Sequence, residues 1–135
     1  MAFQIKPRED TYFPKKKATK NKGYLAWLHE LPCCVTGRYG VEAAHLSYAN
    51  PMFAHYGRGR GTKSSDRWAL PLSPEEHRKQ HSMNEEEYWH QFPWSPHILA
   101  LTIWGVYSCD GDLATEIATS VIMSRVARIE ECRFK

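Results

Sequence analysis

The sequence predicts an α+β fold in which a two-stranded β-hairpin and one helix are surrounded by further α-helices. Two short strand-like segments are present, and the second leads directly into a proline-started, acid-rich helix at residues 74–81. The C-terminal third instead has apolar residues at helical spacing. With 135 residues and 42% hydrophobic content, the chain is long enough for one such domain and too short for two ordinary ones.

Residues 1–22 are predicted to form a flexible basic arm, and residues 23–135 a single domain with a C-terminal helical extension. Pro7 and Pro14 break any helix in the arm, and its lysines follow no apolar periodicity. The domain opens with a short helix candidate at residues 23–31, which the following proline ends.

The hairpin is expected to pair a strand at residues 41–46 with one at residues 67–72. Between them lies a long loop rich in glycine and arginine, and long loops in small domains tend to be functional. Asn84 is placed to cap a short helix after the proline-started one. An apolar helix at 98–107 and an amphipathic helix at 113–131 complete the prediction.

Cysteine usage and hydropathy predict a cytoplasmic protein without membrane association. The four cysteines follow no secreted-scaffold pattern, and free thiols suit a reducing compartment. No stretch approaches the roughly 18–20 consecutive apolar residues of a membrane span. The first residues lack the apolar core of a signal peptide.

Charge is distributed unevenly along the chain. Residues 1–63 hold 11 Lys and Arg against 4 Asp and Glu, a balance of +7, whereas residues 64–135 hold 7 against 11, a balance of −4. A basic half joined to an acidic half indicates that one face meets a polyanion, although basic tails can also serve solubility alone.

Three histidines and one aspartate are the candidate site residues. His77 and His81, four residues apart, are predicted to share one helix face, where two imidazoles can converge on one metal ion. His45 in the first strand can take a proton from water near neutral pH. Asp66 can supply an oxygen ligand or orient the His45 ring. Imidazoles favour Zn²⁺ or Ni²⁺, and a carboxylate favours Mg²⁺ or Mn²⁺. The sequence therefore leaves the identity of the metal open among these four ions.

The stretch from about residue 31 to 92 resembles the HNH, or ββα-metal, endonucleases, and more narrowly phage and prophage proteins related to the recombination-enhancement nuclease. The segments that carry this resemblance are PCCVTG at 32–37, EAAH at 42–45, GRGTKSSDRW at 59–68, LPL at 70–72 and EHRKQHSMNEE at 76–86. The resemblance implies an α+β fold with a small ββα-metal core. It also implies a metal-dependent endonuclease that hydrolyses DNA with weak sequence preference, in phage or prophage recombination or processing inside a bacterial cell.

By this resemblance, His45 takes the general-base position and His77 and His81 take the metal positions on the helix. Asp66 stands about where the family's middle residue, often asparagine, lies. Ala44 departs from the pattern, because many HNH proteins have a metal-binding Asp or His at that position and alanine cannot ligate. Either Asp66 then fills the ligand role or the site binds metal weakly.

A second departure concerns the structural zinc that such nucleases commonly hold with two Cys-x-x-Cys pairs. The corresponding positions here are Cys33, Thr36, Ser73 and Glu76. One thiolate, two hydroxyls and a carboxylate do not form a zinc cage. The structural zinc is therefore predicted to be absent, with the C-terminal helices supplying the stability that it would give.

Cations of the arm, the long loop and the histidine-bearing helix are expected to contact DNA phosphates. They are Lys15, Lys16, Lys17, Arg58, Arg60, Lys63 and Arg78. DNA is therefore the predicted partner, and the resemblance adds a recombination protein as a second one. The sequence sets no oligomeric state.

Two other functions are consistent with the same residues. A DNA-binding accessory protein with a decayed HNH site would explain the missing zinc cysteines and the alanine at position 44. A helical interaction protein that recruits a partner through its acidic half would need neither DNA nor metal. Gel shifts at low salt and cleavage assays separate the three.

Overall fold

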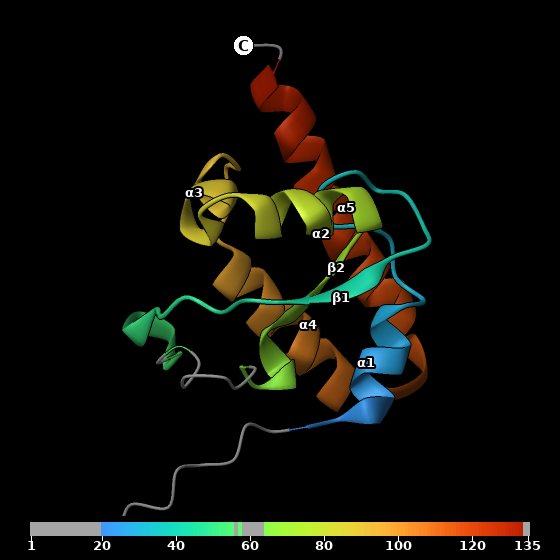
Figure 1. The fold of residues 1–135 in the computed structure, drawn as a ribbon. Coiled ribbons are helices and arrows are strands. Elements are labelled where there is room, and N and C mark those ends of the chain that lie inside the picture. The colour runs from blue at the N-terminus through green and yellow to red at the C-terminus, as the bar shows by residue number, and fades with distance from the viewer. Residues whose placement is uncertain (1–19, 56, 58–63, 134–135) are drawn as a thin grey trace, which may run out of the picture.

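The computed structural model describes residues 20–55, 57 and 64–133 (Figure 1). These residues form an α+β fold, as predicted from the sequence. Its helices and strands are α1 (Lys22–Leu28), β1 (Glu42–His45), β2 (Ala69–Leu72), α2 (Pro74–Ser82), α3 (Glu85–His90), α4 (Pro96–Cys109) and α5 (Ala114–Arg133). Its 3₁₀ turns are η1 (Pro51–Phe53), η2 (Asp66–Trp68) and η3 (Gly111–Leu113).

The predicted hairpin is confirmed, and both strands are shorter than expected. β1 and β2 pair antiparallel, with Glu42 opposite Leu72 and His45 opposite Ala69. The second strand was expected to begin at residue 67, but η2 replaces its first residues because Trp68 N donates to the Ser65 carbonyl in a turn. All of β2 is buried, which fits a strand covered on both faces.

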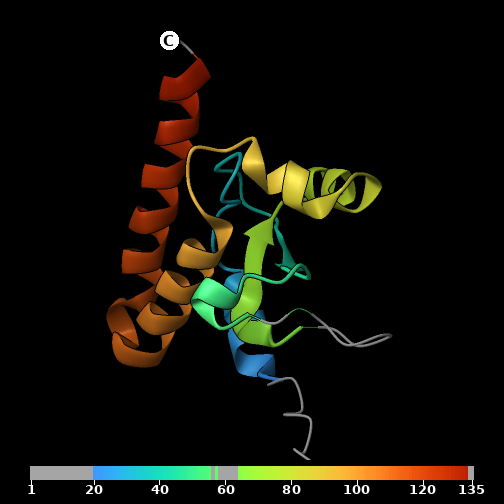
Figure 2. The same ribbon diagram turned by 90° about the vertical axis from the view of Figure 1, so that its left-hand side faces the viewer.

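Helices cover both faces of the hairpin. In the turned view of Figure 2, α4 lies between α5 and the hairpin, and it contacts α5, β2 and η2. The apolar stripe by which α5 packs consists of Ala114, Ala118, Ile122, Val126 and Ile129. Across the part of the chain that the structure describes, no helix is both long and apolar enough to cross a membrane.

The folded part begins earlier than residue 23. Asn21 caps α1, because its side chain accepts a hydrogen bond from Tyr24 N at 3.0 Å. The backbone N–H of Asn21 also donates to Asp66 Oδ2. Residues 20–22 therefore belong to the domain rather than to the arm. Residues 1–19, which make up the rest of the predicted arm, lie outside the described part.

Two buried histidines join the segment after β1 to α4. His97 on α4 is 1% exposed and packs against the rings of Tyr48, His55 and Trp68, at centroid distances of 4.9, 5.2 and 5.4 Å. Burial, and then the proximity of His55, lower the pKa of His97 to about 4. Burial likewise lowers the pKa of His55. Both rings are therefore neutral in the folded protein near pH 7.

This neutral pair predicts that the protein loses stability in mild acid. Below about pH 6.5, the unfolded chain binds a proton at His97 that the folded chain excludes until about pH 4. The free energy of unfolding should therefore fall by up to about 1.4 kcal/mol per pH unit from this residue within that window. Urea unfolding at pH 7, 6 and 5 should show a shallower fall for His97→Phe, and an unchanged slope would contradict this interpretation.

Candidate functional site

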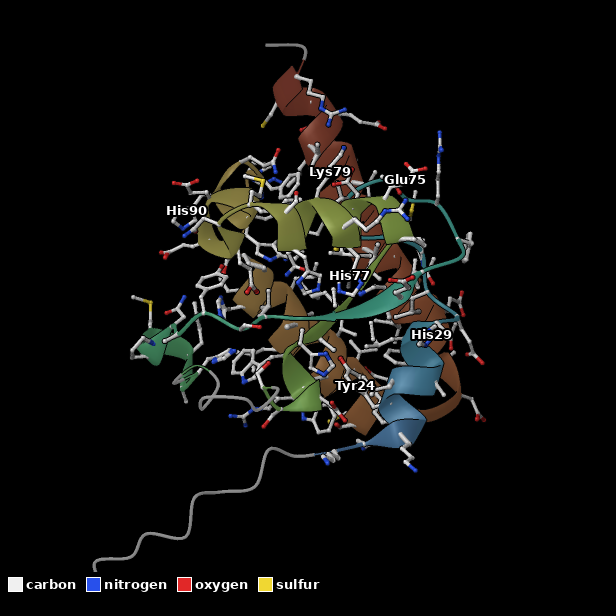
Figure 3. The ribbon with its side chains drawn as sticks, in the orientation of Figure 1. Tyr24, His29, Glu75, His77, Lys79 and His90 are labelled. Atoms are coloured by element: carbon white, nitrogen blue, oxygen red, sulfur yellow. The ribbon has the colours of Figure 1, made fainter. Side chains whose placement is uncertain are left out.

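The two helix histidines meet on the side of α2 that faces the hairpin. Figure 3 shows His77 directed from α2 toward β1, with Glu75 and Lys79 on the opposite side of the helix. The Nε2 atoms of His77 and His81 are 3.0 Å apart, and the ring centroids are 4.7 Å apart. The i, i+4 spacing thus brings the two imidazoles together, as the sequence predicted.

Glu42, at the start of β1, fixes the orientation of the His77 ring. Its Oε2 atom accepts a hydrogen bond from Nδ1 of His77 at 2.8 Å. Because Nδ1 carries this proton, Nε2 of the neutral ring presents a lone pair toward His81. A carboxylate behind a histidine is the usual outer-shell partner of a metal-binding imidazole. Sequence reasoning assigned Glu42 no role, although it lies in the same short strand as His45.

The histidine pair fits one divalent metal ion. The 3.0 Å contact has the length of a hydrogen bond from His81 Nε2–H to His77 Nε2. It is also close to the spacing of two nitrogens bound at about 2.0–2.1 Å and roughly at a right angle on one metal ion. Histidine nitrogen is a ligand for Zn²⁺, Ni²⁺ and Mn²⁺ alike. Among the described residues, this site included, no group of three or more His, Cys, Asp or Glu side chains is placed to hold a metal ion, so the pair has no third such ligand beside it.

His45 and Asp66 form a second pair at the other end of β1. The Nε2–H of His45 donates to Asp66 Oδ1 at 2.8 Å, and both side chains are mostly buried. Asp66 Oδ2 accepts the backbone N–H of Asn21 at 2.6 Å. Each carboxylate oxygen therefore has a protein donor, which holds the His45 ring and leaves Nδ1 as its free nitrogen. Of the two roles predicted for Asp66, these contacts support orientation of His45; its role as a metal ligand stays a prediction.

The predicted site residues thus form two pairs, the His77–His81 pair on α2 and the His45–Asp66 pair, which contact opposite ends of β1. Glu42 begins β1 and His45 ends it, which places their Cα atoms about 10 Å apart at the usual rise of an extended chain. Ala44, between them, is fully buried against the core. No ligand can come from this position without displacing core packing.

A hydrogen-bonded chain fixes the end of β1 to the helical layer. Glu85 on α3 accepts from the backbone N–H of Ser47 at 2.8 Å and from Gln80 Nε2 at 3.2 Å. Gln80 lies on α2 and is buried. The strand end that carries His45 is therefore tied to the helix that carries the histidine pair. The sequence did not predict this connection, because glutamine and glutamate on helices are usually exposed to solvent.

The positions of the related zinc cage are occupied by local hydrogen bonds. Cys33 Sγ accepts from the backbone N–H groups of Val35 and Thr36, both at 3.4 Å, so this thiol stabilises the turn that follows it. Gly37 closes this turn at φ +74°, where a Cβ atom would also meet Met123 Cε at 3.3 Å.

The second half of that cage is used to hold α2 and α3 together. Ser73 caps α2 by accepting from Glu76 N at 3.3 Å. Glu76 accepts from Tyr88 OH at 2.8 Å and from Lys79 Nζ at 3.2 Å. Burial and this bond to Glu76 raise the pKa of Tyr88. These contacts give the four positions a structural use, and the absence of a zinc ion stays a prediction.

The predicted phosphate contacts fall mostly outside the described residues. Arg78 is exposed on α2. The other six cations, Lys15, Lys16, Lys17, Arg58, Arg60 and Lys63, lie in segments that the structure does not describe. The described part resumes at Ser64 next to the end of β1, since Ser64 Oγ donates to the carbonyl of Leu46, the residue after His45, at 2.7 Å.

Comparison with known proteins gives one family. The family DUF968, described as a protein of unknown function, matches residues 4–103. No curated protein and no solved structure matches the chain. The matched region includes both histidine pairs, the hairpin and most of α4. The chain belongs to the DUF968 family.

Proposed function

We propose that this protein is a metal-dependent endonuclease that hydrolyses DNA phosphodiester bonds with weak sequence preference. The observation that carries the proposal is the imidazole pair of His77 and His81, with Nε2 atoms 3.0 Å apart and Glu42 bonded behind His77. A carboxylate bonded to the second ring nitrogen is the outer-shell contact that metal-binding histidines usually have. The resemblance to HNH nucleases points to the same chemistry, in phage or prophage DNA processing.

In this proposal, His45 is the general base. Its Nε2–H is bonded to Asp66, so its free Nδ1 is the atom that takes a proton from the attacking water. Asp66 stabilises the imidazolium that results, because the carboxylate is already positioned on the other ring nitrogen. The N–H of Asn21 in turn keeps Asp66 from rotating away.

His77 and His81 are the residues that would hold the ion, with Glu42 as their support. When bound there, a divalent ion would supply charge stabilisation to the scissile phosphate and its leaving oxygen. Among the described residues, His77 and His81 are the pair that would hold it.

DNA is the proposed substrate because of the charge in the first half of the chain. Residues 1–63 carry 11 basic and 4 acidic side chains. The segments that hold most of this charge adjoin residues that contact the pair: Asn21 bonds to Asp66, and Ser64 bonds to Leu46, the residue after His45. Contacts from lysine and arginine to phosphate give affinity without sequence preference.

A DNA-binding protein with a decayed site is the second candidate. Ala44 is fully buried where relatives of the HNH type present a ligand, and both oxygens of Asp66 are engaged by protein donors. A protein of this kind would bind DNA and leave it intact with every metal tested.

Glu42 provides a test of the metal site that does not depend on cleavage. Replacing it with alanine removes the partner of His77 Nδ1, so affinity for Mn²⁺ or Ni²⁺ should fall about 10–100-fold in a calorimetric titration. The metal affinity of Glu42→Gln should lie between those of wild type and Glu42→Ala, because the amide oxygen can still accept the hydrogen bond from His77 Nδ1. Glu75→Gln, on the far side of α2, should leave the affinity unchanged. If Glu42→Ala and Glu75→Gln lose the same metal affinity, net charge rather than the bond to His77 would explain the loss.

Nicking of supercoiled plasmid tests the reaction itself. With Mg²⁺, Mn²⁺ or Ni²⁺, wild-type protein should nick the plasmid, and His45→Ala should be slower by about 10²–10⁴-fold because the general base is lost. His90→Ala, which changes an exposed histidine on α3, should retain full activity. Equal nicking by wild type and His45→Ala would show that the assigned chemistry is wrong. DNA binding without nicking in any metal would favour the second candidate.

The arm is expected to contribute binding rather than chemistry. Deleting residues 1–19 removes five Lys and Arg while keeping Asn21 to cap α1 and hold Asp66. If four of those cations meet phosphates, the slope of log affinity against log salt should fall by about 3–4 units. Cleavage at saturating DNA and low salt should persist. A slope equal to that of wild type, or loss of cleavage at saturation, would contradict this role.

A further inference from the structure

Three cationic residues lie next to the bond that holds Asp66, and they come from two distant parts of the sequence. The backbone N–H of Asn21 donates to Asp66 Oδ2 at 2.6 Å, although 45 residues separate the two in the chain. Lys20 and Lys22 flank Asn21, and Arg67 follows Asp66. One hydrogen bond therefore gathers two lysines and an arginine beside the pair that contains the proposed general base.

Both segments belong to the folded domain and lie at the same end of it. Figures 1 and 2 each show the first turn of α1 beside the segment that leads into β2. Asn21 is held from two directions, because its side chain also caps α1. Asp66 is buried in η2, where Trp68 N donates to the Ser65 carbonyl. The backbone that carries the three cations is thus fixed relative to the site.

Within residues 20–55, 57 and 64–133, none of the three cations pairs with a carboxylate. The ion pairs in this part of the chain involve other side chains. Asp66 bonds through its two oxygens to a histidine and to a backbone N–H instead. Lys20 and Lys22 are exposed to solvent. Three positive charges therefore lie next to one carboxylate that is already engaged, and this excess favours an anionic ligand.

Arg67 is held against an aromatic ring and has hydrogen-bond donors without acceptors. Its guanidinium carbon lies 5.1 Å from the centroid of the Trp68 ring. Its Nε atom is buried and has no hydrogen-bond partner, although the side chain as a whole is only partly buried. A positive charge that has lost part of its water without gaining an anion is costly. Phosphate would relieve this cost, because its oxygens match the planar fork of donors that arginine presents.

We propose that Lys20, Lys22 and Arg67 form a phosphate-binding surface that holds a DNA strand against the His45–Asp66 pair. The proposal rests on the proposed function, since that function makes the pair the site of cleavage. Cations spread over two segments suit a chain of phosphates, which lysine and arginine bind without reading the sequence. The surface is part of the fold, so it sets where the strand lies relative to the general base.

The test measures binding of the full-length protein to a short duplex, by fluorescence anisotropy in EDTA so that no cleavage occurs. Each lysine or arginine that neutralises a duplex phosphate adds about 0.9 to the slope of log affinity against log salt. The triple variant Lys20→Gln/Lys22→Gln/Arg67→Gln should therefore lower this slope by about 2–3 units. A triple variant that keeps the wild-type slope would overturn the surface.

A matched control separates this surface from net charge. The triple variant Arg38→Gln/Arg128→Gln/Arg133→Gln removes the same charge from exposed positions elsewhere, and its slope should equal that of wild type. An equal loss of slope in both triple variants would overturn the proposal, because net charge would then explain the effect.

A double variant tests the surface without disturbing the ring contact of Arg67. In Lys20→Gln/Lys22→Gln, both changes are at exposed positions, so the melting temperature should not change. Its slope should fall by about 1–2 units. An unchanged slope in this variant would contradict the role of the two lysines.

Two further measurements distinguish the partner and the proposed function. A poly-glutamate peptide should displace the duplex only weakly, and displacement as strong as that by unlabelled duplex would overturn the proposal in favour of an acidic protein. If wild type nicks plasmid and the first triple variant keeps its salt slope, the surface is wrong and the proposed function stands. If that variant loses slope and wild type nicks with no metal, the surface is supported and the proposed function is wrong. Absence of duplex binding by wild type at low salt would overturn both.

Discussion

The register of the four-residue hairpin is the constraint on which both histidine pairs depend. Glu42 is paired with Leu72, one residue before the cap of α2, so its carboxylate lies beside the helix that carries His77. His45 is paired with Ala69, the residue after η2, so its imidazole lies beside Asp66. A slip of one residue would exchange the faces of β1, exposing Ala44 and directing His45 into the core. The buried side chains of β2 oppose such a slip, because all four are covered.

Each reactive group is held by a partner that comes from elsewhere in the sequence. Glu42 hydrogen-bonds to His77, which is 35 residues away in the sequence, and Asp66 hydrogen-bonds to His45, which is 21 residues away. Asn21, 45 residues from Asp66 in the sequence, bonds to its carboxylate, which joins the start of α1 to the His45–Asp66 pair. Hydrogen bonds from Asn21, α2 and α3 thus restrain the two-stranded sheet and the histidines beside it. The turn at η1 belongs to the same system through the Leu46 carbonyl.

Local signals in the sequence predicted most elements of the fold, because each has a distinct cause. Proline and acidic residues open α2, and the Asn84 side chain caps α3 by accepting from Glu87 N at 3.1 Å. The four-residue spacing of His77 and His81 likewise predicted that their side chains lie on one helix face. The start of β2 was less predictable, since a 3₁₀ turn at Asp66 replaces its first residues and has no sequence pattern. The start of α1 is set by the Asn21 side-chain cap, a signal that the sequence reasoning did not use. The partners of the histidines were missed or left open because they are tertiary contacts across many residues.

The central claim is that the Nε2 atoms of His77 and His81 jointly hold a divalent ion while Glu42 keeps the Nδ1 proton of His77. Long-range ¹H–¹⁵N NMR of the histidine side chains during a Zn²⁺ titration tests it most directly, because the ¹⁵N shift identifies the tautomer and the coordinated nitrogen of each ring. The account predicts coordination shifts at Nε2 of both residues, a retained proton at Nδ1 of His77, and small changes at the surface histidines 29 and 90. Coordination at other histidines, or unchanged spectra for His77 and His81 at saturating Zn²⁺, would contradict it.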